Sequence, residues 1–258
     1  MFPREWRSHE GVRTGLIADI HGNLQALETV LHRLNDDRVD QLVCLGDVAA
    51  LGPQPAAVIS RLRDLQCACV LGNADAWLLP DPPLAAVSAT TIPVAELTRW
   101  CAEKLSAADA DFLEDMPATI EIPLGSGLTL LAFHASPSSL DDVIAATTPA
   151  AELDAMLSGR STDVFAGGHT HVQLLRRFNQ AHIVNPGSVG LPGVGPGDPD
   201  VSVNERVDWA EYAVIDVSES GVTVELHRLR LDVPRMVATA AASGMPHVDW
   251  WASKWHAG

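Results

Sequence analysis

The chain has 258 residues, of which 47% are hydrophobic, enough for one large core but not for several independent domains. Its 17 Lys and Arg residues against 33 Asp and Glu give a formal net charge of −16, which repels a nucleic-acid backbone and argues against duplex nucleic acid as a partner. A small phosphorylated substrate is still compatible with this charge, because bound divalent cations reverse the local field.

The sequence carries no feature typical of a secreted or membrane protein. The first ten residues are too charged for a signal peptide, and no apolar run is long enough to cross a bilayer. Cys67 and Cys69 lack the spacing of a zinc knuckle or a redox pair. Cys44 and Cys69 lie in apolar runs, where small buried thiols are common. We therefore expect a cytoplasmic protein with reduced cysteines and no membrane partner.

The first third of the chain alternates apolar strands with amphipathic helices. Apolar runs at residues 15–18, 42–45 and 67–71 predict three strands. Apolar residues spaced three and four apart follow the first two runs, as is typical of helices packed on a sheet. Asn23 is placed to cap the first of these helices, and Pro55 is suited to the first turn of the second. This β-α-β-α-β order predicts a parallel sheet.

Residues 76–123 interrupt the alternation and predict a helical insertion over the site. Three prolines within residues 80–83 break the chain, and apolar residues at helical spacing follow them. The glycines within residues 125–127 then predict a hairpin turn between two strands. Residues 149–157 resemble a helix, which leads into a further apolar strand at residues 164–166.

The last third of the chain changes to hairpins. Alternating runs on either side of residues 179–180 and of residues 218–221 each predict a pair of antiparallel strands. Residues 193–208, rich in Gly, Pro and Asp, predict a loop without regular structure. The tail, residues 234–258, is rich in alanine before it reaches three tryptophans. We therefore expect a single domain with two sheets over residues 1–258.

Five apolar runs of the chain each end in side chains that bind metal ions. Ligands in α/β proteins bind beyond the carboxyl ends of strands, so five such endings in series predict one shared site. The candidate ligands, in chain order, are Asp19, His21, Asp47, Asn73, His134, His169 and His171. Each of these short motifs alone has an ordinary explanation, since Asp-x-His occurs by chance and Gly-Asp forms turns. The combination predicts a metal centre.

This ligand set indicates a binuclear centre. Carboxylate, imidazole and amide donors without a thiolate suit manganese, iron, cobalt, nickel or zinc. Seven ligands are too many for one tetrahedral ion and natural for two ions that share a bridge, for which the two oxygens of Asp47 are best suited. Two ions about 3.5 to 4 Å apart deprotonate one water, and the resulting hydroxide attacks phosphorus in line. The sequence contains no Walker loop and no G-x-S-x-G elbow.

His182 is the one further histidine for which we consider a role in the site. His182 precedes a turn at residues 185–188. This turn would face the site if the strand that leads into it ends at the site. We therefore weigh a substrate contact by His182 against a purely structural role.

The motifs resemble those of the calcineurin-like metallophosphoesterase superfamily. The family pattern is D-x-H, then G-D, then G-N-H-[DE], then a lone H, then G-H-x-H, and the candidate ligands match it in the same order. Further segments are similar to the small bacterial and archaeal phosphodiesterases related to the YfcE proteins. These segments are residues 19–23, 51–55 and 185–190.

The resemblance implies a mixed α/β fold, a four-layer αββα sandwich with the site on one edge. It implies that one divalent ion is held by Asp19, His21, Asp47 and His171. It implies that a second ion is held by Asp47, Asn73, His134 and His169. Family members commonly use manganese or nickel, often hydrolyse phosphodiesters, and many form homo-oligomers, so we expect the same here.

One position departs from the family pattern. Ala74 stands where the family has a histidine that contacts the phosphate and helps to protonate the leaving group. A methyl group does neither, so the resemblance implies an enzyme without its usual general acid. Asp75, which orients that histidine in the family, is present, and the resemblance assigns catalytic roles to Asp47, Asn73 and Asp75 and a substrate contact to Asn73.

Two functions of different class remain open from the sequence. The first is a two-metal phosphodiesterase or phosphatase, favoured because every candidate ligand is present. The second is a catalytically weak scaffold for protein interaction, like the phosphoesterase-fold subunit of retromer, which also lacks the histidine at the position of Ala74. Its docking patch would be Trp250, Trp251 and Trp255, unless these pack onto their own domain or a second copy.

Diadenosine polyphosphate hydrolases and phosphoprotein phosphatases are nearer rivals among enzymes. Both usually keep the histidine that is missing here, and both have more arginines around the phosphate. Arg176 and Arg177 are the only adjacent pair near the expected site, so we do not favour this alternative.

Overall fold

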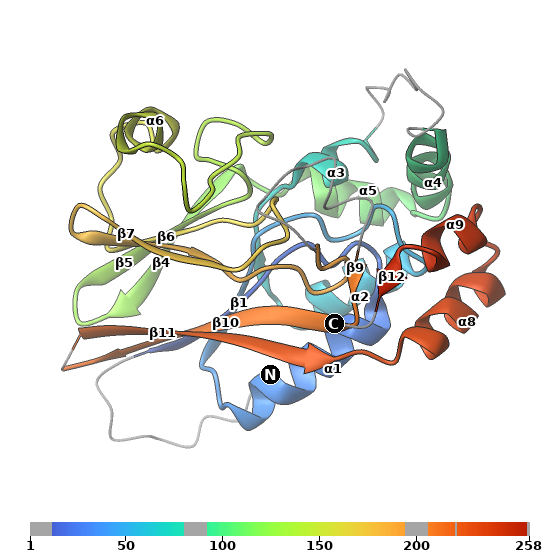
Figure 1. Cartoon of the computed structure of the whole chain (residues 1–258), viewed down its shortest axis with the longest axis horizontal. Helices are drawn as coiled ribbons and strands as arrows, with labels where there is room; N and C mark the ends of the chain where they lie inside the picture. The colour runs from blue at the N-terminus through green and yellow to red at the C-terminus, as the bar shows by residue number, and fades with distance from the viewer. Residues whose placement is uncertain (1–11, 80–91, 194–205, 220, 257–258) are drawn as a thin grey trace.

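Two five-stranded mixed sheets lie face to face, with helices on their outer faces (Figure 1). The computed structural model describes residues 12–79, 92–193, 206–219 and 221–256. This arrangement confirms the predicted four-layer αββα sandwich.

The first sheet contains the parallel strands predicted from the first third of the chain. Its strands in spatial order are β11 (Gly221–Arg230), β10 (Trp209–Ser218), β1 (Arg13–Ile17), β2 (Gln41–Cys44) and β3 (Ala68–Cys69). β1, β2 and β3 are parallel, whereas β10 pairs antiparallel with β1. The hairpin β10–β11 confirms the turn predicted near residues 218–221. β3 is shorter than its apolar run, because the chain leaves the sheet after Cys69 to approach the site.

The second sheet follows the hairpins predicted in the middle of the chain. Its strands in spatial order are β4 (Thr119–Gly125), β5 (Leu128–Phe133), β6 (Val164–Ala166), β8 (Ala181–Asn185) and β7 (Leu174–Phe178). The inner strands β5, β6 and β8 are parallel, and the hairpins β4–β5 and β7–β8 close the two edges. The carboxyl ends of β5, β6 and β8 therefore lie at one edge of this sheet.

Three apolar layers hold the sandwich together, as the alternation of side chains along each strand requires. In β1, Leu16 packs between the two sheets, whereas Ile17 faces the helices outside the first sheet. Those helices are α1 (Leu24–Asp36) and α2 (Pro55–Asp64). On the far side, α6 (Ala150–Met156) covers the second sheet (Figure 1).

Helices lie at the start of the range for which the sequence predicts an insertion and again in its described part after residue 91. They are α3 (Asn73–Ala76), α4 (Ile92–Glu103) and α5 (Ala107–Glu114). The prolines at residues 80–83 lie outside the described residues. Among the residues that are described, no helix combines the length and apolar character that a membrane span requires.

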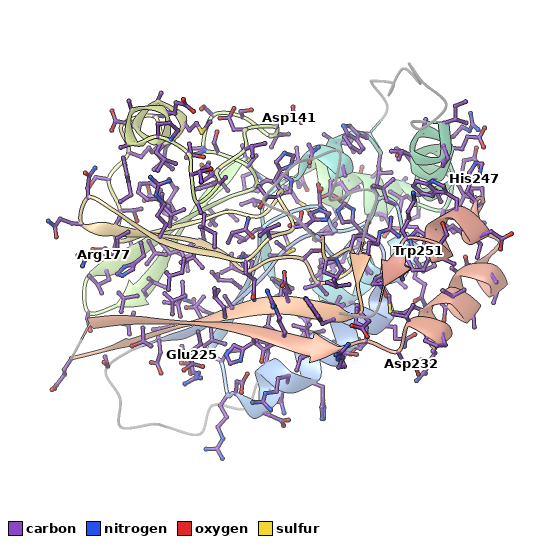
Figure 2. All side chains as sticks on the ribbon, viewed as in Figure 1. Asp141, Arg177, Glu225, Asp232, His247 and Trp251 are labelled. Carbon is purple, nitrogen blue, oxygen red and sulfur yellow. The ribbon has the colours of Figure 1, made fainter. Side chains whose placement is uncertain are left out.

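The C-terminal segment packs back onto the domain rather than presenting a tryptophan patch. It contains α8 (Val233–Ser243), α9 (Val248–Ala252) and β12 (Trp255–His256). Trp251 is fully buried and lies on the side of α9 that faces the domain (Figure 2). The His247 ring lies 2.6 Å from the Glu96 carboxylate of α4, which joins the tail to the insertion.

The loop expected at residues 193–208 requires a correction. Arg206 and Val207 form a short strand, β9, that pairs in parallel with β12. Residues 194–205 lie outside the described part of the chain. The composition of the segment predicts a loop. The strand was not predicted because its partner, β12, lies about fifty residues further along the chain, and such distant pairing leaves no local sequence pattern.

Asn23 caps α1 as predicted, and it also contacts a distant turn. Its side-chain oxygen accepts a hydrogen bond from the Ala26 backbone at 3.2 Å, and its amide donates to the Gly190 carbonyl at 3.3 Å. We expect Asn23→Ala to lower the free energy of unfolding by about 1 to 2 kcal/mol. Urea unfolding measures this loss, and Asn35→Ala on the exposed side of α1 should change the same quantity by less than about 0.5 kcal/mol. Equal effects of the two substitutions contradict the capping role.

Candidate metal centre

The seven candidate ligands converge at the carboxyl ends of the central strands of both sheets. Asp19 and His21 follow β1, Asp47 follows β2, Asn73 begins α3 after β3, His134 follows β5, and His169 and His171 follow β6. The ladder between β1 and β2 continues past the strands, because Asp19 N donates to Gly46 O at 3.0 Å and His21 N to Asp47 O at 2.9 Å. Backbone hydrogen bonds therefore fix where these side chains begin.

Four of these side chains form a tight buried cluster, which we call the Asp19 group. Its donor atoms lie within 4.8 Å of one another, and its members are Asp19, His21, Asp47 and His171. They match the first ion site that the family resemblance implies.

The histidines of the Asp19 group are oriented to present lone pairs to one point. His21 Nδ1 lies 3.1 Å from the Ala50 carbonyl, and His171 Nδ1 lies 2.6 Å from the Leu191 carbonyl. A carbonyl only accepts hydrogen bonds, so in the neutral rings these contacts place the proton on Nδ1 and leave Nε2 bare. The two Nε2 atoms are 3.1 Å apart. Two facing lone pairs at this distance fit a cation that both atoms coordinate.

A second cluster, the His134 group, repeats this arrangement around an amide oxygen. His134 Nδ1 lies 2.8 Å from the Leu45 carbonyl, which leaves its Nε2 facing Asn73 Oδ1 at 2.9 Å. His169 Nδ1 lies 3.3 Å from the same Asn73 oxygen. The group consists of Asp47, Asn73, His134 and His169.

Asp47 is the member that the two groups share. Its Oδ2 lies 3.6 Å from His21 Nε2 in the Asp19 group and 3.5 Å from His134 Nε2 in the His134 group. Its Oδ1 accepts a hydrogen bond from the Ala74 backbone at 2.9 Å, which fixes the carboxylate plane. The structure therefore brings all seven predicted residues together around one carboxylate.

Electrostatics in the cluster divide its titratable groups. Burial acts to lower the pKa values of His134 and His171, but the nearby Asp47 and Asp19 charges outweigh it and raise both pKa values. Burial raises the pKa of Asp47.

Burial lowers the pKa of His21 to about 3, and His171 adds to the effect. Burial lowers the pKa of His169 to about 4, with a further contribution from His134. Burial alone raises the pKa of Asp19, but the neighbouring histidines, His171 first, outweigh it, so that this pKa lies below its ordinary value. Neutral imidazole and carboxylate are the forms that bind divalent metals.

The backbone at the site adopts conformations that side chains other than glycine rarely take. Five of the seven candidate ligands have positive φ, between 48° and 68°. They are Asp19, His21, Asp47, His169 and His171. Left-handed backbone at a non-glycine residue costs of order 1 to 3 kcal/mol, and such residues cluster at functional sites. The fold holds these residues in strained positions that gather their donors.

The glycines of the motifs allow the loops to approach the ligands. A Cβ atom on Gly72 would lie 2.0 Å from Asp47 Oδ1 and 2.3 Å from the Asp47 backbone nitrogen. Any larger residue there would displace the carboxylate that the two groups share.

Asp75 supports the site without facing it. Its buried carboxylate accepts hydrogen bonds from the backbone of Val48 at 2.9 Å and of Ala49 at 3.1 Å, in the loop that follows Asp47. Burial, together with the Asp47 charge, raises the pKa of Asp75 to about 7. The sequence predicted Asp75 as catalytic, whereas its contacts make it a positioning residue for the Asp47 loop.

Two polar residues missed as site residues connect the metal-facing loops to each other. Asn185 Nδ2 donates to the Gly168 carbonyl at 2.6 Å, next to His169. Ser188 Oγ donates to the Asp19 carbonyl at 2.8 Å. The sequence singled out their segment, residues 185–190, but gave no signal for either contact, because both partners lie far away in the chain.

A pocket opens in front of the cluster. Five candidate ligands border it, and apolar side chains and one arginine make up the rest of the described lining. The lining comprises His21, Asp47, Asn73, His169 and His171, then Leu51, Ala74, Trp77, Val94, Leu97, Leu191 and Trp250, and Arg206.

His182, which we weighed as a substrate contact against a structural role, does not belong to this lining. It pairs with Val164 near the start of β8, whereas the site lies beyond the carboxyl ends of the strands. The turn after β8 faces the site, but His182 precedes Asn185, the last residue of that strand, by three positions and lies toward its opposite end.

Comparisons with known proteins agree with this geometry. A family model described as the calcineurin-like phosphoesterase superfamily domain matches residues 12–207. An uncharacterized protein of Methanocaldococcus jannaschii is 24% identical over 250 residues, which cover 91% of this chain and 93% of that protein. The chain belongs to the calcineurin-like phosphoesterase superfamily.

Solved structures show the same fold. The crystal structure of a metallophosphoesterase from Sphaerobacter thermophilus is 25% identical, with a TM-score of 0.70 over 95% of this chain and 99% of that one. A hypothetical protein from Pyrococcus horikoshii OT3 is 18% identical, with a TM-score of 0.77 over 96% of this chain and 99% of that one.

The strain at the ligand positions predicts an unusual order of stabilities. Because His169 has φ of 68°, we expect metal-free His169→Gly to be more stable than metal-free His169→Ala by about 1 kcal/mol. Urea unfolding of the two variants measures the difference. The same pair of substitutions at Glu28, exposed in α1, should give the opposite order, because alanine is the better helix former. If the alanine variant is more stable than the glycine variant at both positions, the backbone of His169 is not strained.

Proposed function

We propose that this calcineurin-like phosphoesterase is a two-metal enzyme that hydrolyses a small organic phosphodiester. The observation that carries the proposal is the close approach of potential metal donors on either side of Asp47. His21 Nε2 faces His171 Nε2, and His134 Nε2 faces Asn73 Oδ1. Donor atoms that converge on one point beside a carboxylate support a site built to bind metal ions. Two such clusters with a shared carboxylate support two ions rather than one.

The chemistry divides between the bound ions and the chain. Two divalent ions would supply a deprotonated water at neutral pH and neutralise charge on the phosphoryl oxygens. The chain contributes the placement of the donors, through strand ends and through carbonyls that fix each imidazole. Asn73, which lines the pocket beside Asp47, is placed to contact a phosphate oxygen.

Manganese is our proposal for the native metal. The donors are imidazole, carboxylate and amide oxygen, with no thiolate in either group, and such ligands suit manganese while also accepting iron, nickel, cobalt or zinc. Among the described residues, the group of side chains placed closely enough to hold a metal ion contains no cysteine.

The residue at position 74 determines which leaving groups the proposed enzyme prefers. The Ala74 methyl group lines the pocket and offers no proton to a departing oxygen. Activated or aryl diesters, whose leaving groups depart without a proton, should therefore react faster than alkyl monoesters.

The scaffold alternative receives less support. Its docking patch depends on exposed tryptophans, but Trp251 is fully buried and packs 5.3 Å from the Trp255 ring, while Trp250 lines the pocket. The tryptophan tail thus belongs to the domain and to the wall of the candidate site.

The shared carboxylate gives the most direct test of the proposal. We expect Asp47→Asn to lower kcat/KM for bis-p-nitrophenyl phosphate by about 10²-fold or more and to reduce bound manganese, because the variant loses the charge that serves both groups. Turnover and manganese content are measured on protein purified without chelators. Asp111→Asn, on the exposed face of α5, serves as the control and should leave both quantities unchanged. Undiminished hydrolysis by Asp47→Asn contradicts the bridging role.

A series of diesters with graded leaving-group pKa tests the missing acid. For the wild type we expect the logarithm of kcat to fall steeply as leaving-group pKa rises, since Ala74 donates no proton. Ala74→His should flatten this dependence, as general acids contribute about 10²- to 10⁴-fold where the leaving group is poor. Metal content of both proteins is measured in parallel. The same slope in the two proteins means that position 74 is not the acid position.

A further inference from the structure

Arg206 is a buried cation at the edge of the candidate site. It lies on β9, and only 2% of its surface is exposed. It nevertheless lines the pocket that His21, Asp47 and His171 border. The rest of the described lining away from the metal-facing residues is apolar, so within that lining Arg206 is the single positively charged side chain.

No carboxylate among the described residues neutralises this guanidinium. Its Nη1 donates to the Trp251 carbonyl at 3.3 Å, and its Nε is buried without a hydrogen-bond partner. Burial alone lowers the pKa of Arg206 to about 9, a value that still leaves it charged at neutral pH. Arg228, by contrast, lies 2.9 Å from the Glu211 carboxylate. An unpaired buried charge is costly in a folded protein, so its presence points to an anion that binds there.

The tryptophan tail holds Arg206 in a fixed place. The guanidinium carbon lies 5.3 Å from the Trp251 ring centre and 5.7 Å from the Trp255 ring centre, within cation–π range of both. The Arg206 backbone nitrogen donates to the Lys254 carbonyl at 2.8 Å, and β9 pairs with β12 at Trp255. The arginine is therefore positioned before any substrate arrives, which reduces the entropy cost of binding.

We propose that Arg206 binds a phosphoryl oxygen of the substrate and so supplies a charge-assisted contact in a pocket where Ala74 has no polar side chain. A planar guanidinium with free donors matches phosphate geometry, and in a pocket with apolar walls its attraction is only weakly screened. This inference rests on the proposed phosphoesterase function. It also gives the C-terminal segment a role, because α9 and β12 carry the rings that hold the arginine.

Arg206→Met removes the charge and keeps most of the side-chain volume between the two rings. On manganese-loaded protein we expect kcat/KM for bis-p-nitrophenyl phosphate to fall about 10²-fold, and the inhibition constant of inorganic phosphate to rise about 10- to 100-fold. Bound manganese should be unchanged. The melting temperature should be equal to or above that of the wild type, because a costly unpaired charge has been removed. A residue with a structural role alone predicts a lower melting temperature with normal kinetics.

Two further variants make the result decisive. Arg61→Met, which removes a partly exposed arginine paired with Glu28 far from the pocket lining, should match the wild type in kinetics, phosphate inhibition and bound manganese. Arg206→Lys keeps the charge but loses the planar fork, so we expect kcat/KM to fall about tenfold. If Arg206→Met does not fold, the kinetics of Arg206→Lys test the inference instead. The inference is overturned if the folded variant keeps kcat/KM and phosphate inhibition within about threefold of the wild type.

Calorimetry separates this inference from the proposed function. If the wild type hydrolyses no phosphoester with any divalent metal, the proposed function fails. Binding of inorganic phosphate to manganese-loaded wild type and Arg206→Met then still tests the arginine. Weaker binding by the variant supports the anion site, whereas equal binding by the two proteins, or none by the wild type, overturns it.

Discussion

The site depends on hydrogen bonds between imidazole Nδ1 atoms and backbone carbonyls. The carbonyls of Ala50, Leu45 and Leu191 each hold one ring of His21, His134 or His171. In the neutral ring, each contact leaves a bare Nε2 aimed at the other donors, where a cation between them would be coordinated by several lone pairs. The same loops carry positive φ angles at five ligand positions, so the fold stores unfavourable energy where metal binding recovers it.

The sandwich makes this arrangement possible because it brings strand ends from both sheets to one edge. β1 and β2 contribute the Asp19 side of the cluster, and β5 and β6 contribute histidines from the second sheet. Ser188 and Asn185, in the turn after β8, then connect the two halves through the Asp19 and Gly168 carbonyls. Relative movement of the sheets would separate the donors, so packing between the sheets and metal affinity should be coupled.

The sequence was a good guide wherever function follows from local pattern. Each ligand follows an apolar run, and strand ends meet at one edge, so the cluster around Asp47 was predictable before any coordinates. Features that arise from pairing between strands far apart in the chain were not predictable from the sequence. Arg206 lies in a segment that looks like a loop, and its place depends on β12. Between the two roles weighed for His182, its place near the start of β8 favours the structural one, because position along a strand, and not nearness in sequence, decides which residues reach the site.

Crystals grown with manganese, measured for anomalous scattering, test the central claim most directly. The account predicts two peaks, one within the Asp19 group and one within the His134 group, with Asp47 contacting both. A single peak, or none, at saturating manganese would contradict a binuclear centre and with it the proposed hydrolysis.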